Sequence, residues 1–202
     1  MIGGGSVIAE KSLRDAVRRA YSAAAERPTV KHAFPVGRPF AESLGYPADL
    51  LDTIPPIAYE AFSGVSCVSL FSEIPFGSRL LDLGCGAGLD SIIAAKRVGP
   101  GGSVTGVDFS EEMLERSQKA AGQSAIDNVH FQRADAESLP FDDATFDVAL
   151  VNGIFNLNPK REAIFRELAR VVKPGGAVWA AELILSEPLS AEVLVDETQW
   201  FA

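Results

Sequence analysis

The sequence predicts an α/β fold in which a doubly wound, mostly parallel sheet carries helices on both faces and follows an N-terminal helical cap. Three observations lead to this expectation. From residue 79 onward, short apolar segments alternate with amphipathic ones, which is typical of parallel strands joined by crossover helices. A glycine-rich turn directly follows the first apolar segment. The length of 202 residues suits one ordinary domain, or one domain with a small appendage.

The cap is expected to comprise residues 1–75 and to begin with a helix. Apolar residues recur at helical spacing over residues 11–26, with Ser12 as the N-cap candidate. The polar face of this helix is basic. We expect it to be solvated; the alternatives are that it attracts anions or that it docks onto the acidic remainder of the chain. Its arginines are Arg14, Arg18 and Arg19.

Prolines recur through residues 28–56, and each one removes a backbone hydrogen-bond donor. Long helices are therefore excluded there, and we expect only short ones around residues 40–44 and 48–51. The boundary to the main domain is placed near residues 75–77, so that residues 76–202 form that domain.

The main domain is expected to alternate strands with helices. The strands are predicted at residues 79–83, 103–107, 129–133, 146–151 and 177–183. The helices are predicted at about residues 89–98, 111–121 and 160–171. Ser110 precedes two acidic residues and is predicted to cap the second of these helices, because a helix N-terminus favours negative charge.

Composition and charge exclude several classes of protein. The chain is 47% hydrophobic and 22% charged, as expected of a folded globular protein. The best apolar run, residues 176–185, contains Glu182 and is too short to span a bilayer. No secretory signal is recognisable at the N-terminus, so we expect a cytoplasmic protein without membrane contact. The net charge of −9 argues against nucleic acid binding, and no metal site is expected.

The most informative motif is the glycine turn of residues 84–88, which connects a buried strand to a helix. Glycine is required where a ligand approaches the backbone closely or where φ is positive. Such a turn can also serve only to pack the helix on the strand, and this alternative stays open.

Asp108 ends the second predicted strand, twenty residues after Gly88. A carboxylate in this position can accept hydrogen bonds from both hydroxyls of a ribose, which indicates a cofactor containing a nucleoside. A nicotinamide dinucleotide is the rival. Its G-x-G-x-x-G fingerprint is broken here, because Leu89 occupies the last position.

Two further strand ends carry polar residues. Asp135 and Ala136 follow the third strand, where they can contact an adenine; the alternative is that Asp135 only caps a turn. Asn152 ends the fourth strand, at the sheet edge where ligands of parallel sheets bind. Residues 171–176 are interpreted as a helix end and a structural turn that leads to the last strand.

Together these elements resemble the S-adenosylmethionine-dependent methyltransferases with the Rossmann-like fold, over residues 79–185. The resemblance implies that the glycines line the methionine part of the cofactor, that Asp108 holds the ribose, and that Asp135 with Ala136 contacts adenine. Phe109 and Met113 would pack nearby, although core packing explains both equally well. The resemblance therefore predicts a cofactor site formed by Asp82, Gly84, Cys85, Gly86, Gly88, Asp108, Phe109, Met113, Asp135, Ala136 and Asn152. The chain ends soon after the fifth strand, whereas the resembling fold normally adds a helix and two strands, so we expect those strands to be missing.

Residues 44–51 and 152–159 resemble, more narrowly, the arsenite methyltransferase branch and its uncharacterised relatives. That branch uses cysteine thiolates to hold trivalent arsenic, which suits a soft ion. Here Gly153 and Val65 stand where thiols are expected, and Cys85 lies in the cofactor turn. Only Cys67 remains as an arsenic ligand, so we expect a small organic acceptor rather than arsenite.

No side chain can be named as an essential acid or base. The candidates for contact with the methyl acceptor are Tyr21, His32, Arg38, Asn152 and Asn156. His32 could act as a general base, and an ordinary surface histidine is the alternative. Two other functions stay open: a catalytically silent module that retains the cofactor fold, and, more weakly, a dehydrogenase.

Overall fold

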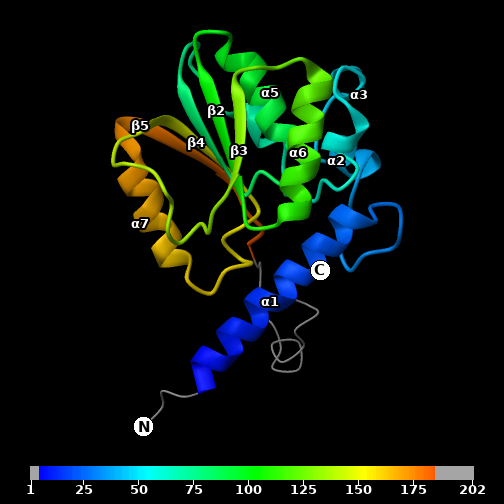
Figure 1. Cartoon of the computed structure of the whole chain (residues 1–202), viewed down its shortest axis with the longest axis vertical. Coiled ribbons are helices and arrows are strands. Elements are labelled where there is room, and N and C mark those ends of the chain that lie inside the picture. Colours follow the sequence, from blue (N-terminus) through cyan, green and yellow to red (C-terminus); the bar gives the residue numbers. More distant parts are fainter. Residues whose placement is uncertain (1–4, 185–202) are drawn as a thin grey trace.

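The computed structural model describes the backbone of residues 5–184 and the side chains of residues 13–184 (Figure 1). Five parallel strands form one sheet in the order β3-β2-β1-β4-β5. The strands are β1 (Arg79–Leu83), β2 (Ser103–Asp108), β3 (Val129–Arg133), β4 (Phe146–Asn152) and β5 (Val172–Ala181). The predicted doubly wound, mostly parallel sheet is therefore confirmed.

Three helices cover the two faces of the sheet. Helices α5 (Leu89–Val98) and α6 (Glu111–Ser124) lie on one face, and α7 (Arg161–Val171) lies on the other (Figure 1). Alternate residues of a strand point to opposite faces. Leu80 of β1 accordingly packs with α5, whereas Leu81 packs with α7. Burial on both faces explains why these strands are continuous apolar runs.

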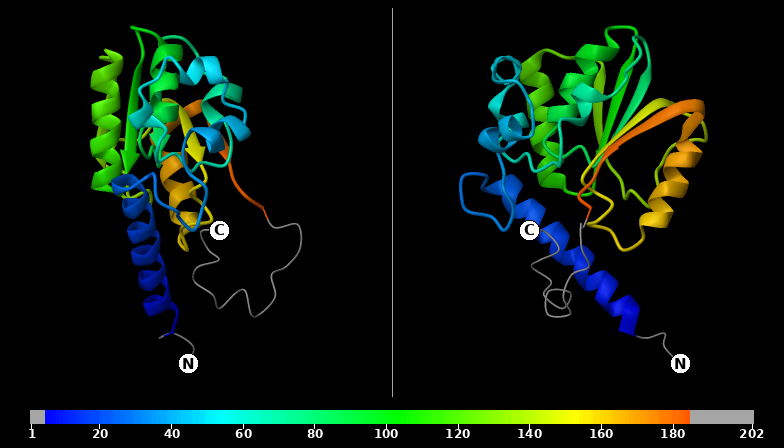
Figure 2. Two further views of the ribbon diagram at one scale, coloured as in Figure 1. Left: turned by 90° about the vertical axis from the view of Figure 1, so that its right-hand side faces the viewer. Right: turned by 180° about the vertical axis from the view of Figure 1, so that it is seen from behind.

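The N-terminal segment begins with α1 (Gly5–Glu26), which crosses below the sheet beside the carboxyl ends of its strands (Figures 1 and 2). Four short helices follow: α2 (Arg38–Ser43), α3 (Ala48–Leu51), η1 (Pro56–Ala58) and α4 (Val68–Phe71). They pack against α5 and α6 through a shared apolar cluster that includes Tyr46, Leu51, Leu89 and Ile92.

Several local predictions need correction. Helix α1 begins at Gly5, so Ser12 lies inside it and does not cap it. Strand β5 begins at Val172 and ends at Ala181, because the predicted turn is a bulge within the strand. The β4 pairing passes from Val172 to Ala177 across this bulge. A side chain at Gly176 would lie 2.6 Å from the carbonyl oxygen of Asp147, which explains the glycine there.

Two other features bear on the sequence predictions. The Ser110 cap is confirmed, because its side chain accepts a hydrogen bond from the Met113 backbone at 3.2 Å. The predicted boundary at residues 75–77 lies in the turn that leads into β1. Within residues 5–184, no helix combines the length and the apolar character needed to cross a bilayer.

Candidate cofactor site

A cavity of about 500 Å³ opens at the carboxyl ends of the strands. Its walls come from the glycine turn after β1, the ends of β2 and β4, the loop after β3, and α1. Open parallel sheets bind ligands at this edge, where the strand order reverses on either side of β1. The volume falls in the range of small-molecule pockets.

The three glycines of the turn play different parts. All have positive φ values, of 77°, 52° and 92° at Gly84, Gly86 and Gly88. A side chain at Gly86 would meet only the Met113 sulfur, at 4.0 Å, so the backbone there is open to a ligand. A side chain at Gly88 would instead press on Ser117 of α6 at 3.0 Å. Gly88 does not line the cavity. Its role is therefore to allow close packing of a helix, which is the alternative that the sequence left open for this turn.

Asp108 ends β2 at the cavity wall and is only 8% exposed. Its carboxylate accepts hydrogen bonds from the backbone N–H groups of Gly86 and Ser110, both at 2.9 Å. Burial raises the pKa of Asp108, and these N–H groups partly offset that effect. Each oxygen retains a lone pair that can accept a ribose hydroxyl. Phe109 and Met113 line the same wall.

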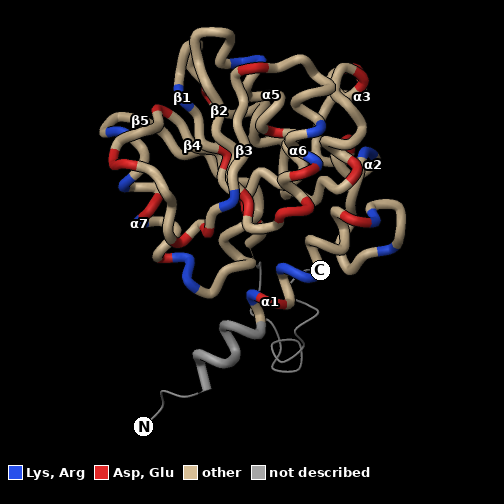
Figure 3. Tube along the Cα trace, viewed as in Figure 1, with Lys and Arg blue, Asp and Glu red and all other residues tan. Residues whose placement is uncertain are grey.

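The loop after β3 places Asp135 and Ala136 at the cavity, as predicted. The Asp135 side chain is 64% exposed and pairs with Arg14 of α1 at 3.3 Å. Arg14 also pairs with Glu137 at 3.4 Å, and Glu137 accepts a hydrogen bond from Asn158 at 2.8 Å. These contacts fasten α1 to the loop after β3, and Asn158 connects that loop to the one after β4. Figure 3 shows basic positions on the described part of α1.

The basic face of α1 was expected to be solvated, and the structure shows it partly solvated and partly docked: Arg18 and Arg19 are exposed, whereas Arg14 is half-buried. Besides Arg14, Arg18 lines the cavity and donates a hydrogen bond to the carbonyl oxygen of Phe109 at 3.2 Å. The sequence signal for these two residues was the contrast between a basic first helix and an acidic main domain.

Two more buried carboxylates border the cavity. Asp82, at 2% exposed, accepts a hydrogen bond from the Ser91 hydroxyl at 2.5 Å. Burial and the neighbouring Asp90 charge raise the pKa of Asp82 to about 8. Burial also raises the pKa of Asp90, although the donors Ser69, Tyr46 and Asn152 counteract the effect.

Asn152 was predicted to contact ligands, and the structure shows a bracing role as well. Its oxygen accepts hydrogen bonds from the backbone N–H groups of Val65 (2.8 Å) and Ser66 (3.2 Å). Its amide nitrogen donates to the Ser66 carbonyl oxygen (2.7 Å) and to Asp90 (2.9 Å). Asn152 thus holds the loop of residues 62–66, part of which forms a cavity wall.

The acceptor-side candidates are only partly brought together. Tyr21 lines the cavity with Asn152 and stacks on Phe34 at 4.7 Å between ring centroids. Burial, followed by the charges of Asp108 and Glu182, raises the pKa of Tyr21. The other three candidates do not line the cavity.

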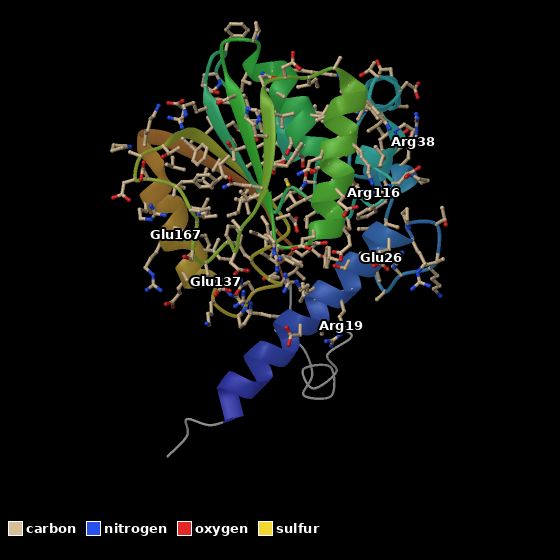
Figure 4. The ribbon with its side chains drawn as sticks, viewed as in Figure 1. Arg19, Glu26, Arg38, Arg116, Glu137 and Glu167 are labelled. Atoms are coloured by element: carbon tan, nitrogen blue, oxygen red, sulfur yellow. The ribbon has the colours of Figure 1, made fainter. Side chains whose placement is uncertain are left out.

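Each of these three is engaged elsewhere. The Nε2 atom of His32 lies 2.9 Å from the Arg27 carbonyl oxygen. Arg38 pairs with Glu42 and Asp52, both at 2.7 Å, and lies far from Glu137 of the loop after β3 (Figure 4). Asn156 bonds to Glu182 and to the Leu183 carbonyl oxygen.

The two cysteines of the chain lie in different surroundings. Cys85 lines the cavity and is buried, and burial together with Asp108 and Asp82 raises its pKa. Cys67 packs among the apolar residues beside α5 and does not line the cavity. Across residues 13–184, no three His, Cys, Asp or Glu side chains cluster in a way suited to a metal ion.

Comparison with known proteins identifies the family. A model of the methyltransferase domain family matches residues 76–200. The chain belongs to this methyltransferase family. This match, together with the relatives and the solved structure described below, confirms the predicted resemblance to the class I S-adenosylmethionine-dependent methyltransferases and to their arsenite branch.

Relatives of this chain include methyltransferases named for different acceptors. An arsenite methyltransferase of Halobacterium salinarum is 34% identical over 158 residues, covering 77% of this chain and 40% of that protein. A demethylmenaquinone methyltransferase of Staphylococcus aureus is 41% identical over 107 residues, covering 52% and 43%. The chain therefore spans about two fifths of the length of these curated relatives.

A solved structure supports the same relationship. The arsenic(III) S-adenosylmethionine methyltransferase of Chlamydomonas reinhardtii superposes with a TM-score of 0.62 at 27% identity. The match covers 81% of this chain and 56% of that one. S-adenosylmethionine is the cofactor of this family. The open backbone at Gly86 and the buried, hydrogen-bonded Asp108 fit its methionine and ribose parts.

Proposed function

We propose that this methyltransferase binds S-adenosylmethionine in the cavity at the strand ends and transfers its methyl group to a small molecule. The observation that carries the proposal is the meeting of Gly86, Asp108 and Asp135 around one cavity of about 500 Å³. When bound, the cofactor supplies a methyl group that its sulfonium already activates. The protein therefore has to align the acceptor and exclude water, more than provide covalent help.

The cofactor would lie along the edge of the sheet. Gly84 and Gly86 would contact its methionine part, and Asp108 would accept hydrogen bonds from the ribose hydroxyls. Asp135 and the Ala136 backbone would face the adenine, which requires Asp135 to exchange or share its partner Arg14. Phe109 and Met113 would supply apolar contact beside the ring.

The acceptor would enter between α1 and the loop of residues 62–66. Tyr21, Phe62 and Leu157 line this part of the cavity and give it a largely apolar surface. A small organic molecule suits such a surface better than trivalent arsenic, which prefers several convergent thiolates. Cys85 is the one cysteine of the chain on the cavity wall, because Cys67 packs elsewhere.

Calorimetry with S-adenosylmethionine and S-adenosylhomocysteine tests the proposal. We expect both to bind, while a nicotinamide dinucleotide, added as the control ligand, does not. Absence of binding by either adenosyl ligand to folded protein would reject the proposal. Transfer of radiolabelled methyl groups to a set of small organic acceptors then separates an enzyme from a silent binding module.

A further inference from the structure

A cluster of charged and polar side chains links α1 to the loops after β3 and β4, and Glu137 lies at its centre. One oxygen of Glu137 accepts a hydrogen bond from the Asn158 amide at 2.8 Å. The other oxygen pairs with Arg14 of α1 at 3.4 Å and with Lys160 at 3.9 Å. These three partners line the cavity, whereas Glu137 itself does not. Glu137 therefore acts on the cavity only through the residues that it holds.

Arg14 bridges two carboxylates, each with a different nitrogen atom. Its Nη1 atom pairs with Glu137 at 3.4 Å, and its Nη2 atom pairs with Oδ1 of Asp135 at 3.3 Å. Arg14 thus engages Asp135 through one oxygen. The other oxygen, Oδ2, can accept a hydrogen bond from the exocyclic amine of an adenine.

The two carboxylates differ in their exposure to water. The Glu137 side chain is 12% exposed, and the Asp135 side chain is 64% exposed. Water screens an ion pair less where it has less access, so Glu137 is the stronger partner of Arg14. Glu137 thereby keeps one half of the guanidinium away from Asp135.

Loss of the Glu137 charge would change how Arg14 engages Asp135. A guanidinium and a carboxylate readily form a bidentate pair, with two parallel N–H···O bonds. With Asp135 as its remaining carboxylate partner, Arg14 would take both Asp135 oxygens. Arg14 would then compete with the adenine amine for Oδ2. The charge of Glu137 thus decides whether the adenine acceptor is free.

We propose that Glu137 is a positioning residue for the cofactor, because by holding Arg14 it keeps Asp135 available to the adenine amine. The inference rests on the proposed function. It also accounts for how α1 remains a wall of the cavity once the cofactor is bound. The pair of Arg14 with Glu137 persists while Asp135 turns to the adenine.

Glu137→Gln tests the role of the charge. Glutamine keeps an oxygen that can accept the hydrogen bond from Asn158, so the loop after β4 retains this contact. Calorimetry measures the affinity for S-adenosylhomocysteine. We expect it to fall by about two- to fivefold, the range that corresponds to one partly exposed ion pair.

A second substitution separates positioning from a merely structural role. Adding Arg14→Met to Glu137→Gln removes the competitor for Asp135, so the double variant should regain most of the lost affinity. Helix α1 keeps its hydrogen bonds from Arg18 to the main chain and from Ser22 to α6. If Glu137 served only to stabilise the fold, the second substitution would leave the affinity low or lower it further.

Salt supplies a second readout of the competition. Ions screen a partly exposed guanidinium–carboxylate pair, so the difference between the parent and Glu137→Gln should narrow as salt rises from about 50 mM to about 500 mM. Glu42→Gln is the matched control, because Glu42 shares Arg38 with Asp52 in the same two-carboxylate arrangement away from the cavity. This variant should bind as the parent does.

The outcomes that overturn the inference differ from those that reject the proposed function. Parent-like affinity of folded Glu137→Gln protein overturns the inference, and so does a double variant that binds no better than the single one. Failure of the folded parent to bind S-adenosylhomocysteine rejects the proposed function instead. If Glu137→Gln does not fold, a crystal structure of the parent with S-adenosylhomocysteine decides. We expect Arg14 on Glu137 and the adenine amine on Asp135, and a bidentate pair of Arg14 with Asp135 overturns the inference.

Discussion

Asp108 serves the local backbone as well as the proposed ribose contact. Its oxygens accept the N–H groups of Gly86 and Ser110, and so connect the glycine turn to the start of α6. The same carboxylate would be presented to the cofactor in a nearly water-free setting, where hydrogen bonds to a charged acceptor are strong.

Replacing Asp108 by alanine should weaken the binding of S-adenosylhomocysteine by about 1.5–3 kcal/mol, because hydrogen bonds to a charged acceptor are lost. Calorimetry measures the change, and Asp142→Ala at an exposed position is the control. A folded Asp108→Ala protein that binds as tightly as the parent would contradict the ribose role.

Asn152→Ala should lower the free energy of unfolding by about 2–3 kcal/mol. The substitution leaves the Val65 N–H without its acceptor and removes a donor from buried Asp90. Urea denaturation measures the effect. Gln123→Ala, which removes an exposed amide on α6, should change the value by less than about 0.5 kcal/mol. Equal effects of the two substitutions would show that the brace is unimportant.

Single residues differ in how far the sequence predicts them. Asp108 and Gly86 are recognisable because they lie at the end of an apolar strand or directly after one, where spacing alone places them at the site. The brace formed by Asn152 is not recognisable, because its partners Val65, Ser66 and Asp90 lie far away in sequence. No local pattern encodes such a contact.

Among the secondary-structure elements, the long periodic segments and the short helices α2 and α3 were predictable, whereas α4 was not. Helices α5 and α7 match their predicted ranges within one residue. Helix α4 has only four residues, and tertiary contacts define it: Arg97 of α5 donates hydrogen bonds to carbonyl oxygens at Ser69 and Ser72. Strand β5 was mislocated because a glycine bulge within a strand has the same composition as a turn.

Two loops meet at the positions where the arsenite branch is expected to carry thiols. A side chain at Gly153, after β4, would lie 2.7 Å from the Val65 side chain of the opposite loop. The two positions are therefore neighbours in space, and both lack sulfur in this chain.

We accordingly expect the 202-residue chain neither to bind arsenite tightly nor to methylate it, because Cys67 and Cys85 do not provide a convergent set of thiolates. Mass spectrometry of arsenic species, compared with a reaction without enzyme, measures this. Methylated arsenic that disappears in Cys67→Ser protein would refute the expectation.

At the scale of the whole molecule, charge is distributed unevenly. Residues 1–40 contain seven Lys and Arg against three acids, although the chain as a whole has a net charge of −9. The contacts of Arg14 with Asp135 and Glu137 show how the basic segment attaches to the acidic domain. Such pairs, which remain at least partly exposed to solvent, contribute little individually to stability, so their main effect is to orient α1.

Stability should fall as the pH rises from about 5 to 8. The pKa of Asp82 is about 8 in the folded protein and near 3.9 when unfolded, so the folded state binds the additional proton in this window. Ionisation of Asp82 lowers the free energy of unfolding by about 1.4 kcal/mol per pH unit, and this decline ends above pH 8. Three other acids have lowered pKa values and change the stability only below about pH 4.5. They are Glu112, Asp147 and Glu167.

Urea denaturation at pH 5.5, 6.5 and 7.5 measures this dependence. Asp82→Asn protein should show a shallower decline than the parent, because asparagine does not titrate. Identical slopes in the two proteins would place the titrating group elsewhere.

The central position of β1 also bears on the order in which the chain folds. Leu80 pairs with Val104 of β2 and with Val148 of β4, so the second pairing closes a much longer loop. Long-range pairing is the slower event in folding. We therefore expect β1, β2 and β3 to assemble with α5 and α6 first, and β4, α7 and β5 to dock afterwards. Pulse-labelled hydrogen exchange during refolding should find Val104 protected before Val148, and the reverse order would contradict this folding sequence.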